Sequence, residues 1–201
     1  WKVADRESGV GAHIPVATGR SVTGIPTGKL AVWWLIGSEI VIFGGLLGCY
    51  LLFRLLYPHW SDAAANTSTL LGSINTFILL SSSFSVVLAH YYAEKKDTLK
   101  AFIFLWVTIG GGLGFLLVKS YEWTMEISHG FVITKNLFWS FYYTAAGLHA
   151  THVIAGMIVM AIISFDVLRG KYLHRVENAG LYWHFVDIVW IFLFPLLYIA
   201  K

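Results

Sequence analysis

The chain has 201 residues, of which 57% are hydrophobic and only 12% are charged, and its mean hydropathy is +0.69. A soluble domain carries about 25% charged residues, so this composition excludes an ordinary soluble protein and indicates an integral membrane protein. The net charge of +3 does not indicate a nucleic-acid binder, because the basic residues lie between apolar runs rather than on one surface with base-stacking aromatics. The single cysteine, Cys49, excludes an intrachain disulfide and a cysteine-rich metal site.

Residues 1–29 contain prolines, glycines and charges and are expected to form an N-terminal surface tail, in which we recognise no cleavable signal with an apolar core. Five apolar segments follow, each long enough to cross a hydrocarbon core of about 30 Å. We expect transmembrane helices near residues 30–56, 69–93, 98–121, 137–166 and 178–200. The sequence therefore predicts an all-α polytopic membrane protein, with one five-helix transmembrane domain over residues 30–201.

The distribution of basic residues predicts the orientation of the chain. Ten of the 14 Lys and Arg residues fall in the tail or in the connections near residues 94–100 and 167–177. Five crossings place these three segments on one face, and positively charged segments favour the cytoplasmic face. We therefore expect the N-terminus inside and the C-terminus outside.

Glu39 lies in the first apolar segment, roughly 6 Å from the predicted bilayer centre at 1.5 Å per residue. An ionised carboxylate at that depth requires a partner, and without one it stays protonated. Two interpretations follow: a proton-relay or proton-antenna group, or a neutral acid hydrogen-bonded to a neighbouring helix. Gly44, Gly45 and Gly48 suit close contact between membrane helices.

Four histidines and an aspartate accompany the later apolar segments. His149 and His152 share a face of the fourth segment, and His184 and Asp187 have the same spacing in the fifth. A haem b held by two histidines is disfavoured, because His152 and His184 differ by about 8 Å in predicted depth. His184 and His90, at the end of the second segment, match better but lie near the interface. Hydrogen-bonding histidines, proton handling and lipid headgroup contact remain as interpretations, and His184 and Asp187 are expected to bond to each other.

Two runs of small residues have competing interpretations. The run Ser81, Ser82, Ser83 and Ser85 predicts hydrogen bonds to a neighbouring helix or to its own carbonyls, with a serine-lined ion path as the alternative. The glycines at 110, 111, 112 and 114 predict a close-packing seam rather than a nucleotide-binding loop, which requires aqueous surroundings.

Stretches in all five predicted helices are similar to one known family. They are residues 37–39 (Gly-Ser-Glu), 75–80 with 89–90, 121–123 (Tyr-Glu-Trp), 147–156 and 182–190. The last two, Gly-Leu-His-Ala-Thr-His-Val-Ile-Ala-Gly and Tyr-Trp-His-Phe-Val-Asp-Ile-Val-Trp, are highly specific. On these residues the chain resembles subunit III of the haem-copper respiratory oxidases, the cytochrome c oxidase type, in a short form with the last five of seven helices.

The resemblance implies a subunit with no catalytic site, haem or copper of its own, packed beside the catalytic subunit I that holds those metals. It implies bound phospholipid and support of proton uptake at the inner face, with Glu39 as the intramembrane carboxylate near subunit I. Without the first two helices, the family's lipid cleft is either incomplete or completed by another subunit. Lys119 departs from an expected glutamine. The remaining polar residues are expected to form a structural, lipid-linked cluster: His90, Glu122, His149, His152, His184 and Asp187.

We therefore expect an accessory subunit of a proton-pumping terminal oxidase in a respiratory membrane, with the bacterial cytoplasmic membrane as the expected location. Expected partners are subunit I, other oxidase subunits, phospholipids and a larger respiratory supercomplex, without nucleic acid. Alternatives are a subunit III-like protein of a quinol oxidase or beside a nitric oxide reductase, and an independent transporter or proton channel with Glu39, His184 and Asp187 along its path. The transporter is disfavoured because its helices are typically interrupted near the midplane, whereas Pro195 lies toward the end of the last segment.

Overall fold

The computed structural model describes residues 27–57 and 60–199, so most of the predicted surface tail lies outside the described residues. Five long helices dominate: α1 (Thr27–Leu56), α3 (Thr69–Glu94), α4 (Thr98–Ser128), α5 (Leu137–Leu168) and α6 (His174–Phe194). A short helix, α2 (Trp60–Ala64), follows α1, and a π-helical turn, η2 (Pro195–Ile199), extends α6. Within the described residues, five helices are long and apolar enough to span a membrane, as the sequence predicts.

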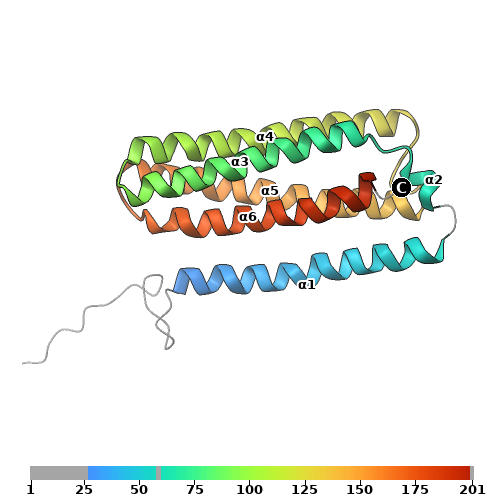
Figure 1. Cartoon of the computed structure of the whole chain (residues 1–201), viewed down its shortest axis with the longest axis horizontal. Helices are drawn as coiled ribbons and strands as arrows, with labels where there is room; N and C mark the ends of the chain where they lie inside the picture. Colours follow the sequence, from blue (N-terminus) through green and yellow to red (C-terminus); the bar gives the residue numbers. More distant parts are fainter. Residues whose placement is uncertain (1–26, 58–59, 200–201) are drawn as a thin grey trace, which may run out of the picture.

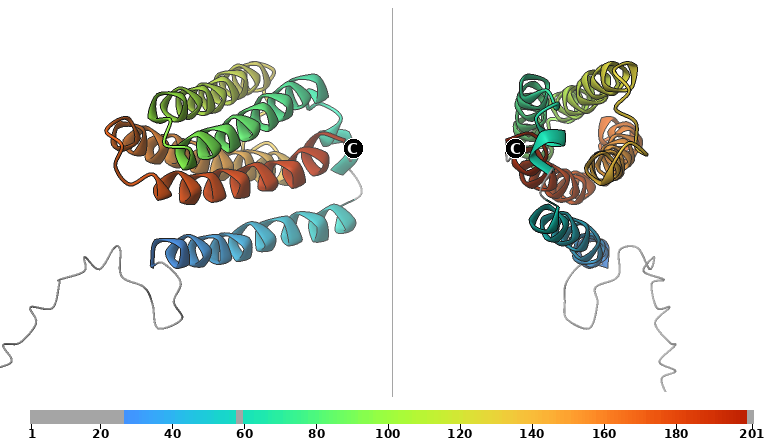
Figure 2. Two further views of the ribbon diagram at one scale, coloured as in Figure 1. Left: turned by 60° about the vertical axis from the view of Figure 1, so that its left-hand side comes forward. Right: turned by 90° about the vertical axis from the view of Figure 1, so that its right-hand side faces the viewer.

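Helices α3 to α6 form an antiparallel four-helix bundle, and α1 lies alongside it as a separate outer helix (Figures 1 and 2). The most extensive contacts join α3 to α4, whereas α1 contacts the bundle mainly through α6. The bundle core is built from large side chains, among them Trp183, Trp190 and Phe115, each at most 1% exposed. The core of the protein is therefore the interior of the α3–α6 bundle, with α1 added to one side.

Helix α1 uses one narrow face to contact the bundle. Its buried residues are Ile36, Phe43 and Tyr50, which are seven residues apart and so lie on one line of the helix surface. Tyr50 Oη donates a hydrogen bond to Leu196 O at 2.7 Å. Most other side chains of α1 remain exposed, so this helix presents most of its surface to whatever surrounds the bundle.

Glycines allow the bundle helices to approach closely. A Cβ at Gly111 would lie 2.5 Å from Ser82 Cβ, and one at Gly112 would lie 2.8 Å from both Met157 and Trp183. The predicted seam on α4 is therefore confirmed at these positions, while Gly110 faces away from it with nothing within 4 Å. The glycines of α1 behave differently: Gly44, Gly45 and Gly48 meet nothing within 4 Å in the described structure, so their predicted close contact does not occur within it. Gly37 also meets nothing within 4 Å.

Three polar residues cap the helices of the bundle. Ser68, Asp97 and Asn136 each accept a hydrogen bond from a backbone N–H in the first turn of α3, α4 and α5. Asp97 lies outside the spanning segments, and its hydrogen bonds from the Lys100 side chain and backbone hold its pKa below the usual range. The connection between α3 and α4 therefore ends one helix and begins the next within a few residues.

Two predicted boundaries are wrong by more than three residues. The third predicted helix, 98–121, continues to Ser128, because Glu122 and Glu126 point into the bundle instead of ending the apolar run. The fifth, predicted to begin at residue 178, begins at His174, because its first turn carries polar residues that remain helical beyond the apolar part. The short helix α2 and the turn η2 were not predicted.

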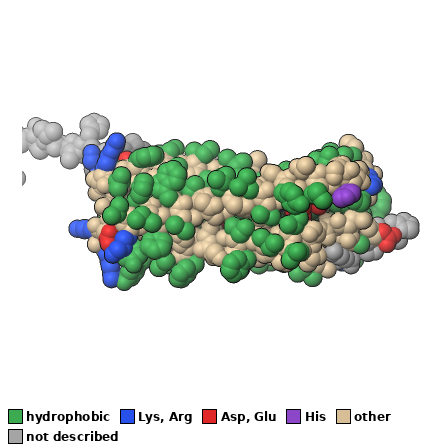
Figure 3. All heavy atoms as spheres, turned by 90° about the horizontal axis from the view of Figure 1, so that it is seen from above, with side chains coloured by type: hydrophobic (Ala, Val, Ile, Leu, Met, Phe, Trp, Pro, Cys, Tyr) green, Lys and Arg blue, Asp and Glu red, His purple; other side chains and the backbone are tan. Residues whose placement is uncertain are grey.

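One end of the molecule is strongly basic. Lys95, Lys96, Lys171 and Arg175 lie in or next to the α3–α4 and α5–α6 connections, and Figure 3 shows basic side chains gathered at that end of a largely hydrophobic surface. We call it the basic end, defined by the α3–α4 and α5–α6 connections.

Candidate functional site

Glu39 meets a partner on a neighbouring helix. Its Oε2 lies 3.0 Å from Nε2 of His152 on α5, and the two side chains are 14% and 16% exposed. The other ring nitrogen, Nδ1 of His152, lies 2.8 Å from Leu148 O, and a carbonyl can only accept, so Nδ1 carries the hydrogen. The 3.0 Å contact between Nε2 and Oε2 falls outside hydrogen-bond geometry. The pair joins α1 to the bundle.

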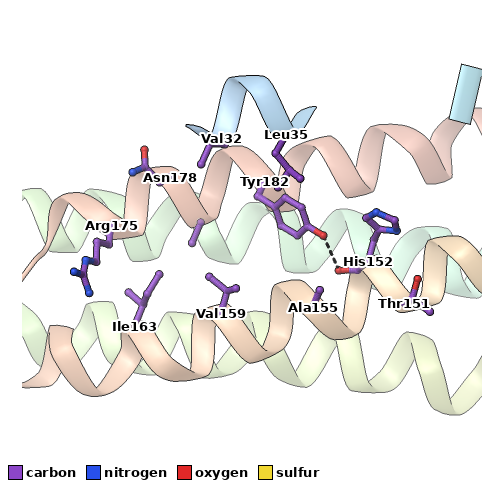
Figure 4. A pocket seen from close by; sticks show the side chains of 11 residues that line it. Val32, Leu35, Thr151, His152, Ala155, Val159, Ile163, Arg175, Asn178 and Tyr182 are labelled. Atoms are coloured by element: carbon purple, nitrogen blue, oxygen red, sulfur yellow. Dashed lines mark hydrogen bonds between the residues drawn. The ribbon is translucent and has the colours of Figure 1, made fainter. Parts of the chain in front are cut away.

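A groove of about 600 Å³ runs between α1, α5 and α6 beside this pair (Figure 4). Arg175 and Asn178 lie at one end, and His152 and Thr151 at the other. Tyr182 Oη donates to His152 O at 3.3 Å across the groove. The remaining lining residues are apolar: Val32, Leu35, Ala155, Val159, Ile163 and Ala179. The groove is therefore amphipathic along its length, with a cationic end near the basic end of the molecule.

A second polar cluster is buried between α4, α5 and η2. Lys119 Nζ donates to Glu122 Oε2 at 3.1 Å and to Tyr142 Oη at 2.9 Å, and it also hydrogen-bonds Tyr198 Oη. Tyr142 Oη donates to Glu126 Oε1 at 2.9 Å. All five side chains are at most 6% exposed. We call these five residues the lysine cluster.

Only part of the lysine cluster was predicted from the sequence. Glu122 was predicted as part of a polar cluster and Lys119 was noted as a departure from the family, but Glu126, Tyr142 and Tyr198 were missed. The spacing of 119, 122 and 126 places all three on one face of a helix, a signal that was present in the sequence. The two tyrosines offered no such signal, because aromatic residues are common in any membrane helix.

His184 and Asp187 do not bond to each other, so that predicted pairing is wrong. His184 Nδ1 instead contacts Ser83 Oγ at 2.7 Å, on α3. Neither carboxylate oxygen of Asp187 reaches hydrogen-bond geometry with a described residue, although Ser83 faces it. The residue is 3% exposed. Helix α3 packs against α6, and Ser83 on α3 supplies the partner that His184 contacts.

The serine run divides its hydrogen bonds in both predicted ways. Ser81 Oγ and Ser82 Oγ donate to the carbonyls of Phe77 and Leu79 on their own helix. Ser85 Oγ donates across to Phe104 O at 2.9 Å. The hydroxyls of Ser81 and Ser82 therefore bond their own helix and that of Ser85 bonds α4, so the run does not line one continuous path.

The last two predicted residues lie apart. His149 is fully buried against the rings of Phe115 and Trp190, at 5.3 and 5.1 Å between centroids, and its nitrogens have no hydrogen-bond partner among the described residues. His90, near the basic end, lies 3.5 Å from Glu94. The structure therefore distributes the predicted polar set over several places and does not gather it into one site.

Comparison with known proteins identifies the family of the chain. The family profile described as "Cytochrome c oxidase subunit III" matches residues 29–201. The chain is 34% identical over 170 residues to "Cytochrome c oxidase subunit 3" of Thermostichus vulcanus, covering 81% of this chain and 82% of that protein. It is 33% identical over 177 residues to the protein of the same name from Bacillus subtilis (strain 168), covering 85% and 84%.

A further relative combines two subunits in one protein. The chain is 30% identical over 183 residues to "Heme-copper oxidase subunit I+III" of Aeropyrum pernix, covering 86% of this chain and 22% of that protein. The profile match includes nearly all of α1 and every later helix. This chain therefore belongs to the cytochrome c oxidase subunit III family and is a subunit of a terminal oxidase.

Proposed function

We propose that the chain is the accessory, non-catalytic subunit III of a proton-pumping oxidase in aerobic respiratory electron transport, seated beside the catalytic subunit in a respiratory membrane. The observation that carries this proposal is the family match over residues 29–201. The relative whose name joins subunits I and III supports direct contact with the catalytic subunit. Other oxidase subunits and a larger respiratory supercomplex belong to the same proposal.

The proposal assigns haem and copper to partner subunits. Nδ1 of His152 contacts Leu148 O, and Nε2 lies 3.0 Å from Glu39 Oε2. The rings of Phe115 and Trp190 pack against His149. Within residues 27–57 and 60–199, no group of three or more His, Cys, Asp or Glu side chains is arranged to share a metal ion. These donors are therefore poorly suited to hold either group. The electron donor, cytochrome c or a quinol, is set by those partners.

The groove beside Glu39 and His152 suits the chain of a phospholipid. Its apolar wall on α5 runs from Ile163 to Thr151, about 18 Å at 1.5 Å per residue, close to the half-thickness of a hydrocarbon core of about 30 Å. Asn178 and Arg175, whose Nη1 also pairs with Asp166 Oδ2 at 3.1 Å, offer hydrogen-bond donors to an anionic headgroup at this end. The proposal therefore places the headgroup at the basic end and the acyl chain along the groove.

Lipid content tests the groove. Arg175→Gln should lower the amount of anionic phospholipid retained by the purified complex, because the headgroup loses its cationic partner. Arg169→Gln is the matched control, since Arg169 belongs to the same basic end but does not line the groove. Quantitative mass spectrometry of extracted lipid gives the result. Equal loss in both variants would contradict the proposed site.

The outer face of α1 is the proposed contact with the catalytic subunit. Gly37, Val41, Gly44 and Gly48 follow the spacing of one helix face, and the three glycines meet nothing within 4 Å. Small residues allow another membrane helix to approach closely, and the fused subunit I+III relative names the partner. This face therefore suits a helix of the catalytic subunit.

Photo-crosslinking tests that contact. A photoreactive residue at Val41, which is 72% exposed, should crosslink to the catalytic subunit in the assembled complex. Leu117 is the control, because it is 63% exposed and belongs to α4, a helix on the far side of the bundle from α1 (Figure 2). A crosslink from Leu117 without one from Val41 would contradict the proposed docking face.

A further inference from the structure

A second cavity lies between α3 and α6 in the half of the bundle near the basic end. Its volume is about 240 Å³, which leaves room for several water molecules at about 30 Å³ each. Three of its lining residues are titratable: His90, Glu177 and His184. The others are Val86, Val87, Gly180 and Leu181. We call it the access cavity.

The mouth of the access cavity carries charged groups. His90 lies 3.5 Å from Glu94, and the side chains are 36% and 68% exposed. Glu177 pairs with Lys29 on α1 at 2.6 Å, with side-chain exposures of 40% and 39%, and His174 acts on Glu177 electrostatically. These residues lie in the first turn of α6, the last turn of α3 and the start of α1, so they belong to the level of the aqueous interface.

The inner end of the cavity is His184, seven residues or about 10 Å along α6 from Glu177. Its Nδ1 lies 2.7 Å from Ser83 Oγ, and the Ser83 hydroxyl also faces Asp187. A hydroxyl can accept one hydrogen bond while donating another. Ser83 is therefore placed to connect the histidine to the carboxyl group.

The series of polar groups that begins at the access cavity ends at Asp187. It is 3% exposed, and both of its oxygens lack a partner at hydrogen-bond geometry among the described residues. One turn further along α6, Trp190 Nε1 donates a hydrogen bond to Thr76 Oγ1 at 3.0 Å. A buried carboxyl without a fixed partner is stable when it holds a proton. These groups therefore form a path that opens only to the access cavity and ends at one proton-binding group.

We propose that the access cavity and the sequence His184, Ser83, Asp187 form a proton-access path from the basic end to a proton-binding site at Asp187. A proton from cavity water binds Nε2 of His184, and the Nδ1 proton passes to Ser83 Oγ. The Ser83 hydroxyl proton passes to an Asp187 oxygen, which leaves His184 neutral with its hydrogen on Nε2. The reverse movement returns the proton to the cavity. The inference goes beyond the proposed function, because it concerns only groups of this chain.

Infrared difference spectroscopy on the complex purified through a tag on this chain tests the path. The C=O stretch of protonated Asp187 is assigned as the band that disappears in Asp187→Asn, and its shift after transfer to D₂O measures proton exchange. Ser83→Ala should slow this exchange by about tenfold or more, because exchange must then wait for local opening of the helix pair. Ser83→Thr keeps a hydroxyl and should restore the rate.

Two further variants separate the path from general effects on the fold. Ser81→Ala removes an exposed hydroxyl that bonds its own helix, so it should exchange at the native rate. Gly180→Val should slow exchange, because a Cβ there makes only ordinary contact, 3.9 Å from Val86, and the added side chain fills the cavity. Native exchange in Ser83→Ala, or no band attributable to Asp187 at any working pH, would overturn the proposal. Neither result depends on which subunits co-purify.

Discussion

Lys119 is 2% exposed, and its ammonium group lies among Glu122, Tyr142 and Tyr198. A buried charge is costly unless it is paired and hydrogen-bonded, and here the pairing also fixes η2 against α4 and α5. The family resemblance leads one to expect glutamine at this position, a neutral donor. Lysine in place of the expected glutamine therefore adds a charge. The free-energy cost of burying that charge depends on the neighbouring carboxylates.

Removal of the Lys119 charge tests whether stability depends on its pairing with the carboxylates. Lys119→Met should destabilise the complex by about 3–5 kcal/mol, because it leaves Glu122 buried without its partner. Lys119→Gln should cost less, because the amide can still donate to the carboxylate or a phenol. The thermal unfolding midpoint of the detergent-purified complex compares the two. Equal stability of the two variants would show that the ammonium group is not needed.

Glu39 is the second residue whose role can be isolated. Glu39→Gln keeps the shape of the side chain and removes its ionisation, so the complex should assemble while proton uptake slows or the enzyme inactivates after fewer turnovers. Oxygen consumption followed until inactivation measures both quantities. His152→Gln should resemble it, since the two side chains share the contact at 3.0 Å. Unchanged turnover and lifetime in Glu39→Gln would contradict a proton role for Glu39.

At the scale of the elements, α1 is held to the bundle at three levels. Lys29 pairs with Glu177, Glu39 contacts His152, and Tyr50 donates to Leu196 O. The groove remains open between Lys29 and His152, while Phe43 packs against the His152 ring at 5.3 Å between centroids. Within the bundle, glycines on α4 leave space into which the side chains of Ser82, Met157 and Trp183 pack.

Substitution of a seam glycine should show how much close helix packing contributes to stability. Gly112→Val should cost about 1–3 kcal/mol, because its side chain would overlap Met157 and Trp183. Gly110→Val is the matched control on the same helix, where nothing lies within 4 Å of the added Cβ. Thermal unfolding of the purified complex distinguishes them. Equal destabilisation would mean that helix propensity, not packing, dominates.

The sequence predicted the helices well and the polar contacts poorly, for one physical reason. The length of an apolar run indicates how much of a segment lies in lipid. The first residues of α3, α4 and α5 were therefore predicted as the structure has them. Apolar runs do not indicate which neighbouring helix a polar side chain on the same segment will contact. The third helix was predicted to end near residue 121, and the partners that hold Glu122 and Glu126 inside the bundle come from α5 and η2, far along the chain. The His184 contact to Ser83 was missed for the same reason.

At the scale of the whole molecule, the basic end should face the cytoplasm. Positively charged connections are retained on that side during insertion, and the described residues place Lys95, Lys96, Lys171 and Arg175 together there. In a Cys49→Ser background, Lys96→Cys should be labelled by an impermeant thiol reagent only in inside-out vesicles. Gly130→Cys is unsuitable because of its φ of +77°, so Ser128→Cys at the opposite end is the reciprocal control. The inverse labelling pattern would reverse the predicted orientation.

The central claim is that this chain is an accessory subunit of a terminal oxidase, and purification in mild detergent through a tag on the chain tests it most directly. We expect a large haem-copper subunit to co-purify, with haem absorption and oxygen-reducing activity in the same particle. A c-type haem in that particle would identify cytochrome c as the donor. Recovery of the chain alone, folded and colourless, would contradict the account.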